Sequence, residues 1–142
     1  MGSTRPVCSA AAQTLRALAR AALAGERPLL VPTGGSSALG DVGFVSAAFE
    51  LAEQVEAGAL PAPAEIYVPV GSGGTLSGLA LGLALAGLRA RVVGVLVTDI
   101  LPPGPRRVTA LARATLARLR RLDPSLPDVA PGALDFELTR AQ

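Results

Sequence analysis

One short stretch limits what this chain can fold into: an apolar run, a cluster of small residues, and a second apolar run. Residues 65–70 are β-branched and aromatic in character, which predicts a buried strand. Residues 75–86 are mostly Leu, Ala and Gly, and predict an apolar helix. Between the two lie four residues whose side chains are too small to block an approaching ligand: Gly71, Ser72, Gly73 and Gly74.

A strand, a glycine turn and the start of a helix together predict an anion site. The first N–H groups of a helix have no partner within the helix, and the helix dipole is positive at that end. Glycine lets a phosphate approach these N–H groups closely, and Thr75 can add a hydroxyl donor or cap the helix. We therefore predict a phosphate-bearing ligand at residues 71–75; the alternative is a tight turn between packed elements.

Neither common nucleotide motif fits this turn. The dinucleotide fingerprint needs a third glycine where Leu76 stands. A Walker-type loop drawn from Gly73 to Gly78 is followed by Leu79 and Ala80, where lysine and a hydroxyl residue are required.

The rest of the chain alternates between strand and helix patterns. Strands are predicted at 28–32, 65–70 and 91–97, with a short last one at 135–138. Helices are predicted at 10–24, 42–56, 75–86 and 107–122. This order predicts an α/β fold, a three-layer sandwich with a mostly parallel sheet. A right-handed crossover through helix 75–86 requires strands 65–70 and 91–97 to be parallel.

The predicted domain organisation is simple. Residues 1–142 are expected to form a single, partial α/β domain, with residues 1–9 disordered. Glycines placed to end helices stand at Gly25, Gly58 and Gly87.

A second glycine loop follows the predicted strand at 28–32. It contains Gly34, Gly35, Ser36 and Ser37. Ligands of parallel sheets bind outside the carboxyl ends of the strands, and both glycine loops and Asp99 follow predicted strands. The second loop is therefore a candidate part of the same site.

Composition excludes several kinds of chemistry. The thirteen basic residues are all arginine, and the chain has no lysine, no histidine and one cysteine, Cys8. A zinc site of the usual ligands and a Ser-His-Asp arrangement cannot be built from such a chain. No side chain can form a Schiff base. We therefore assign no catalytic residue and no metal site.

Nucleic-acid and membrane partners are not expected. The arginines at 107–122 lack interleaved aromatic residues, which favours a solvated helix face. Residues 66–88 carry no charge, but Pro69 and the glycine turn divide them into a strand and a helix too short to span a bilayer. The N-terminus lacks a continuous apolar signal core, so a cytoplasmic location is expected.

The two glycine loops together carry a family resemblance. Residues 31–44, residues 71–75 and the strand that begins at Arg91 resemble the central portion of the D-cysteine desulfhydrase / 1-aminocyclopropane-1-carboxylate deaminase family. These are tryptophan-synthase-β-like, fold-type-II enzymes that use pyridoxal phosphate. The resemblance runs from about residue 28 to residue 99. It implies an incomplete copy of the family's Rossmann-like large domain.

The resemblance also implies functional roles. It assigns the cofactor phosphate to residues 71–75 and a small amino acid as the substrate. Ser37 stands where the family prefers Asn, and Phe44 stands where Tyr is usual, so substrate contacts are expected to differ.

The sequence lacks the anchoring lysine that the resemblance implies. The family carries its Schiff-base lysine in an N-terminal segment that has no counterpart here. We therefore expect a fragment, a truncated or decayed copy, in which covalent attachment of pyridoxal phosphate is impossible and which is inactive alone. A homo-oligomer or a complementing chain would be its partner.

Two alternatives remain open. The chain could be a non-catalytic nucleotide- or phosphometabolite-binding α/β domain, with Asp99 accepting a ribose hydroxyl. It could also be a structural remnant whose apolar faces need a partner chain.

Overall fold

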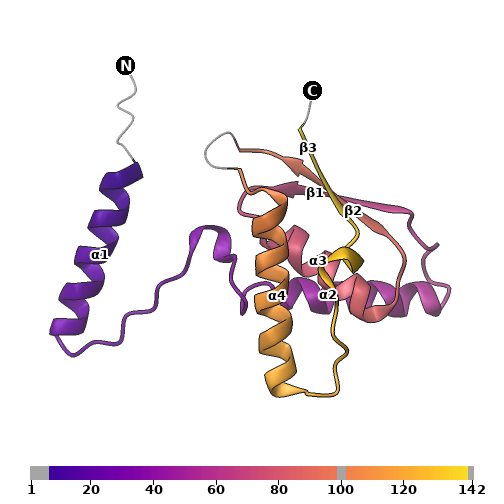
Figure 1. Ribbon diagram of the computed structural model, residues 1–142, viewed down its shortest axis with the longest axis horizontal. Helices are drawn as coiled ribbons and strands as arrows, with labels where there is room; N and C mark the ends of the chain where they lie inside the picture. The colour runs from indigo at the N-terminus through magenta and orange to yellow at the C-terminus, as the bar shows by residue number, and fades with distance from the viewer. Residues whose placement is uncertain (1–6, 99–101, 141–142) are drawn as a thin grey trace. The chain divides into compact units, whose positions relative to one another are not determined.

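The structure is a computed structural model that describes residues 7–98 and 102–140 (Figure 1). It divides the chain into two compact units, Met1–Val31 and Pro32–Gln142. Within its described residues, the first unit consists of one helix, α1 (Val7–Leu23), followed by a segment without helix or strand. The expectation of disorder at residues 1–9 falls mostly outside the described residues, and α1 already begins at Val7.

Glycine ends α1 as predicted. Gly25 has a φ of +77°, in the left-handed region that favours glycine, and its N–H bonds to the carbonyl of Ala22. Gly58 and Gly87 end their helices in the same conformation, with φ of +70° and +71°. The helix stops read from the sequence are therefore confirmed.

The predicted strand at 28–32 was wrong. These residues form no strand, and Leu29, Leu30 and Val31 are exposed. Pro28 and Pro32 flank the run and lack the N–H donor that a ladder needs. The boundary between the two units also falls at Val31, so the run has no neighbouring strand within its own unit.

The second unit contains the remaining elements. They are α2 (Val42–Glu56), β1 (Glu65–Val70), α3 (Gly74–Ala86), β2 (Arg91–Leu96), α4 (Pro105–Leu122) and β3 (Phe136–Arg140), with two 3-10 turns at Thr33–Gly35 and Pro131–Ala133. β3 supplies the third strand in place of the wrongly predicted one.

The sheet is parallel throughout, in the order β1-β2-β3. β1 pairs with β2 from Glu65 opposite Arg91 to Val70 opposite Leu96. Each consecutive pair is connected through a helix, which is the arrangement that a βαβ unit demands. The predicted α/β class and the parallel pairing of the strands on either side of α3 are confirmed.

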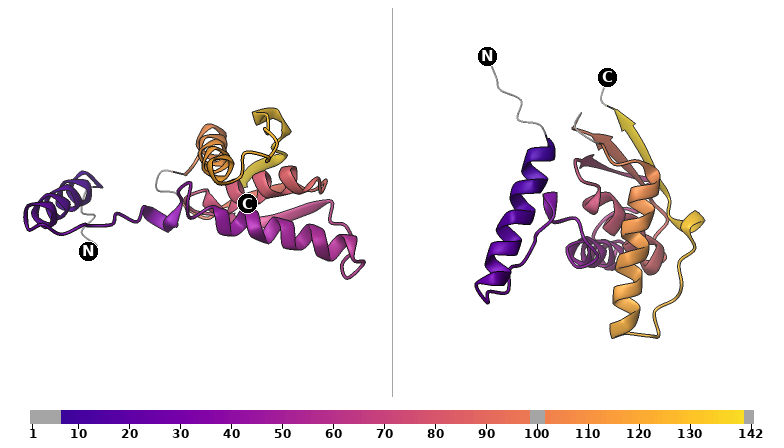
Figure 2. Two further views of the ribbon diagram at one scale, coloured as in Figure 1. Left: turned by 90° about the horizontal axis from the view of Figure 1, so that it is seen from below. Right: turned by 60° about the vertical axis from the view of Figure 1, so that its left-hand side comes forward.

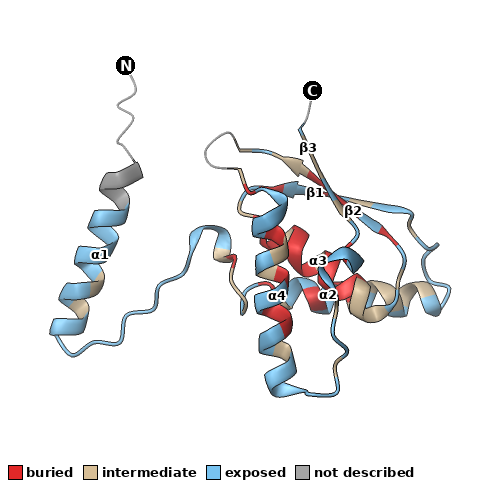
Figure 3. Ribbon diagram, viewed as in Figure 1, coloured by how far each residue is buried: buried red, intermediate tan, exposed pale blue. Residues whose placement is uncertain are grey.

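Helix α3 is the buried centre of this unit. One apolar cluster lies between α3 and the sheet, and includes Val68, Val70, Leu76, Ala80, Val92 and Val108. A second lies between α3, α2 and α4, and includes Val45, Leu81, Ala112 and Leu116. In Figure 3 the buried segments gather on α3 and on the elements that face it. As predicted, the apolar helix is largely buried between the sheet and its neighbouring helices.

The three helices of this unit lie on one face of the sheet (Figures 1 and 2). Side chains on the other face alternate with the buried ones along β1, where Tyr67 is 65% exposed. Among the described residues of the unit no helix covers that second face, so the sandwich is incomplete. None of the helices in the described ranges has the length and apolar character needed to cross a membrane.

Candidate functional site

The glycine turn after β1 has the geometry expected of a ligand loop. Gly73 directly precedes α3 and has a φ of +96°, a conformation that residues with a Cβ rarely adopt. A Cβ at Gly74 would lie 2.5 Å from Ser36 Oγ and 2.7 Å from Asp41 Oδ1. A Cβ at Gly71 would meet no atom within 4 Å. The backbone is therefore tightly packed on the Gly74 side and open at Gly71.

The structure brings both glycine loops to one small cavity of about 70 Å³. Five predicted residues of the first loop line it, together with two of the second: Gly71, Ser72, Gly73, Gly74, Thr75, Gly34 and Ser36. The volume suits several water molecules or a phosphate group, and is small for a whole aromatic cofactor. Phe44 at the start of α2 also lines it.

Ser36 joins the two loops. Its Oγ accepts a hydrogen bond from the N–H of Gly74 at 3.0 Å and lies 2.7 Å from Ser72 Oγ. Ser36 is only 6% exposed, so this bond is shielded from water. Each serine hydroxyl has one proton to donate. If Ser36 donates its proton to Ser72 Oγ, the Ser72 hydroxyl can donate its own proton to a further acceptor.

Gly35 and Ser37 do not line the cavity. Ser37 instead stabilises the turn that carries Ser36: its Oγ donates to the Gly35 carbonyl at 3.3 Å and accepts from the Gly40 N–H at 3.0 Å. The predicted second loop is thus divided between residues at the cavity and residues that shape the turn.

A buried carboxylate beneath α3 was not foreseen from the sequence. Asp41, 1% exposed, accepts a hydrogen bond from Ser77 Oγ at 2.6 Å. Burial raises the pKa of Asp41 above its ordinary 3.8, and the bond from Ser77, the backbone at Ser37 and the charge of Arg107 oppose that rise. Asp41 directly precedes α2, a position where an aspartate commonly caps a helix, but its side chain makes no capping bond and reaches Ser77 of α3 instead.

The raised pKa of Asp41 gives a pH prediction. Above pH 3.8 and up to the raised pKa, the folded state keeps a proton that the unfolded state has lost. Retention of this proton stabilises the folded state. The stabilisation is complete below pH 3.8 and is lost as pH rises from 3.8 through the raised pKa. Asp41→Asn removes the titration. Its stability relative to the wild type should rise with pH across the window in denaturant titrations; a pH-independent difference would contradict the assignment.

Arg107 is a second residue that sequence reasoning missed. It lies in the first turn of α4, and its Nε donates to the Ser72 carbonyl at 3.4 Å. The start of α4 packs on the same loop, since a Cβ at Gly73 would lie 3.4 Å from Pro103 and 3.7 Å from Val108. The sequence predicts a solvated face for the arginines of this helix, and Arg107 is indeed exposed, but its contact with Ser72 is not predicted. Asp99, named in the nucleotide alternative, lies outside the described residues.

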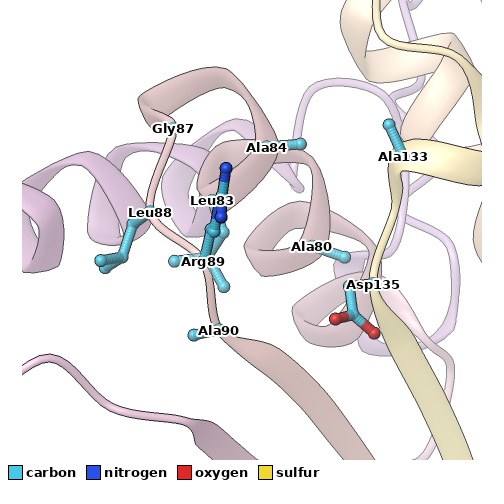
Figure 4. Close-up of a pocket in the computed structure, with 9 residues that line it drawn as sticks. All are labelled: Ala80, Leu83, Ala84, Gly87, Leu88, Arg89, Ala90, Ala133 and Asp135. Carbon is cyan, nitrogen blue, oxygen red and sulfur yellow. The ribbon is translucent and has the colours of Figure 1, made fainter.

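A larger cavity of about 480 Å³ lies at the other end of α3 (Figure 4). Its lining is mainly apolar but includes Arg89 and Asp135, and Asp135 forms an ion pair with Arg91 at 2.9 Å. Residues 88–90 precede β2 and Asp135 precedes β3, so this is the amino-end side of the sheet. Ligands of parallel sheets bind at the opposite side, which favours the glycine loops.

Comparisons with known proteins agree on one family. The family model described as "Pyridoxal-phosphate dependent enzyme" matches residues 3–140. A D-cysteine desulfhydrase of Klebsiella pneumoniae is 41% identical over 90 residues, 63% of this chain and 27% of the relative. A protein of Pyrococcus furiosus named "Putative 1-aminocyclopropane-1-carboxylate deaminase" is 38% identical over 91 residues, 64% of this chain and 27% of the relative.

A D-cysteine desulfhydrase of Salmonella schwarzengrund is 38% identical over 95 residues, 67% of this chain and 28% of the relative. The chain therefore spans little more than a quarter of the length of these relatives. The resemblance drawn from the two glycine loops is confirmed.

Proposed function

Because the chain belongs to the pyridoxal-phosphate dependent enzyme family, we propose that its two glycine loops hold the phosphate of pyridoxal phosphate. The activity of the complete protein would be that of a lyase or deaminase on a small amino acid, in the cytoplasm. The observation that carries the proposal is the bond from the Gly74 N–H to Ser36 Oγ, because it fixes the two loops around one phosphate-sized cavity.

The residues present fit a phosphate group. A Cβ at Gly74 would meet Ser36 and Asp41, so only glycine allows this loop to close on its neighbours. The N-terminus of α3 supplies a positive dipole, and Ser72 and Thr75 supply hydroxyl groups beside it. A single phosphate also needs neither the third glycine nor the lysine whose absence rules out the nucleotide motifs.

Bound pyridoxal phosphate supplies an electron sink for charge that develops beside the amino group of a substrate. The residues of this chain would bind and orient it. The loop 71–75 holds the phosphate, Ser36 fixes the loop, and Phe44 closes one wall of the cavity. No side chain here provides the anchoring amine, so turnover would require a lysine from a complementing polypeptide segment.

Amide NMR of the full chain tests the site. Addition of pyridoxal phosphate should shift the signals of residues 71–75 first, with a Kd of about millimolar order, because a few backbone hydrogen bonds must offset the cost of immobilising the ligand. Gly71→Val adds a side chain where the cavity is open, and should weaken binding by about an order of magnitude.

Gly132→Val is the matched control. Gly132 lies in the remote turn Pro131–Ala133, and a Cβ there also meets no atom within 4 Å. Binding should be unchanged in this variant. Unmoved signals at 71–75, with shifts elsewhere, would show that the phosphate site lies in another part of the chain.

A further inference from the structure

We propose that Arg107 is a phosphate-binding residue of this site, supplied by α4 rather than by either glycine loop. The inference rests on the proposed function, and adds to the backbone loop a charged side chain that the sequence motifs do not contain. It predicts that affinity for a phosphate ester depends on this arginine, whereas affinity for the same ligand without phosphate does not.

The position of Arg107 is the first argument. Its Nε donates to the carbonyl oxygen of Ser72 at 3.4 Å, and Ser72 lines the cavity. Pro103 and Val108, on either side of the start of α4, pack beside Gly73. Val108 is fully buried, so this turn of α4 is held firmly against the loop. A guanidinium has five N–H donors in a planar fork, and the bond to Ser72 uses one of them.

The helix dipole gives the second argument. Cations are disfavoured in the first turn of a helix, where acidic residues are the stabilising choice. The first turn of α4 has no acidic residue and instead carries Arg106 and Arg107. Its N-terminus and that of α3 meet at Gly73. An anion bound between them would neutralise the partial positive charge of both helix N-termini and the charge of the guanidinium.

An ion pair with Asp41 does not explain the position of Arg107. The Asp41 carboxylate is buried and already hydrogen-bonded to Ser77, and the charge of Arg107 acts on its pKa only as the smallest of four causes. Arg107 itself is exposed, and no ion pair to Asp41 occurs among the described residues. The Arg107 guanidinium bonds to Ser72, which lines the phosphate-sized cavity, and a planar fork of donors matches the geometry of a phosphate ester.

The test compares Arg107→Gln with Arg106→Gln in the full chain. Pyridoxal phosphate, inorganic phosphate and pyridoxal are each titrated, followed by amide NMR, at low and high salt. Arg107→Gln should weaken binding of both phosphate ligands about tenfold and flatten the salt dependence, with pyridoxal unaffected. Arg106→Gln removes the same charge from the adjacent residue and should change each affinity by less than about twofold. Arg107→Lys should recover part of the loss.

The outcomes separate this proposal from the one it rests on. If the wild type binds pyridoxal as tightly as pyridoxal phosphate, the phosphate site itself is refuted. If the wild type prefers the phosphate ester and the two glutamine variants lose affinity equally, only the general positive field matters and the role of Arg107 is overturned. Circular dichroism of each variant checks that the fold is retained.

Discussion

Replacing Gly82 with alanine is expected to destabilise the protein by about 1–3 kcal/mol, although alanine is intrinsically the better helix former by about 1 kcal/mol. Gly82 lies in α3 where α2 crosses it. An added Cβ would lie 2.6 Å from the Cβ of Ala48 and 2.8 Å from the carbonyl oxygen of Val45. The second of these is backbone, so the two helices would have to move apart, with loss of packing in both apolar clusters.

Gly43→Ala is the matched control. Gly43 lies in α2, and a Cβ there meets no atom within 4 Å. The same chemical change should be neutral or stabilise by up to about 1 kcal/mol. Denaturant unfolding of both variants measures the difference. Equal effects on the free energy of unfolding would mean that helix propensity, and not the approach of α2 to α3, decides the cost.

Glycines show how far the sequence could predict this fold. Gly25, Gly58 and Gly87 each follow a periodic helical segment, and this local signal correctly placed three helix ends. Gly82 has no local signal, since its role depends on which helix crosses α3. Gly94, within β2, is similar: a Cβ there would lie 2.8 Å from Leu76 Cδ2. Such contacts require tertiary structure.

The strand predicted at 28–32 failed for a related reason. Apolar composition predicts that a segment can pair, but the ladder needs a neighbour with free backbone groups at the correct place. The final strand, predicted from a weaker signal at 135–138, does form as β3, because β2 offers it a parallel edge. Pairing partners, rather than local propensity, decided both cases.

In the candidate site, too, some residues could be predicted from the sequence and others only from the fold. The small residues at 71–74 and 34–37 can be recognised along the chain, and the structure places residues 71–74, Gly34 and Ser36 around one cavity. The bond between Asp41 and Ser77 joins residues 36 positions apart. The contact of Arg107 with Ser72 spans 35 positions. Nothing in the spacing of these residues indicates that they meet, so the charged part of the site could be found only in the fold.

The isolated chain is expected to release neither sulfide from D-cysteine nor ammonia from 1-aminocyclopropane-1-carboxylate when pyridoxal phosphate is added. The physical reason is the absence of lysine, which removes both the covalent anchor and a proton-transferring amine. A positioned acid–base group alone contributes about 10²–10⁴-fold to rate, so turnover should not exceed that of free cofactor in solution. Sulfide and ammonia assays with a cofactor-only blank measure this; release clearly above the blank would contradict it.

Complementation with a second polypeptide tests the same explanation through a gain of activity. The chain spans little more than a quarter of the length of its relatives. The family resemblance implies that the anchoring lysine lies in a preceding segment. Mixing the chain with that segment of a D-cysteine desulfhydrase should restore measurable turnover if the phosphate loop is intact. The same segment with its lysine replaced by alanine should restore none. Gly71→Val in this chain should then lower the recovered activity about tenfold at subsaturating pyridoxal phosphate, whereas Gly132→Val should leave it unchanged, which would tie the chemistry to the loop at 71–75.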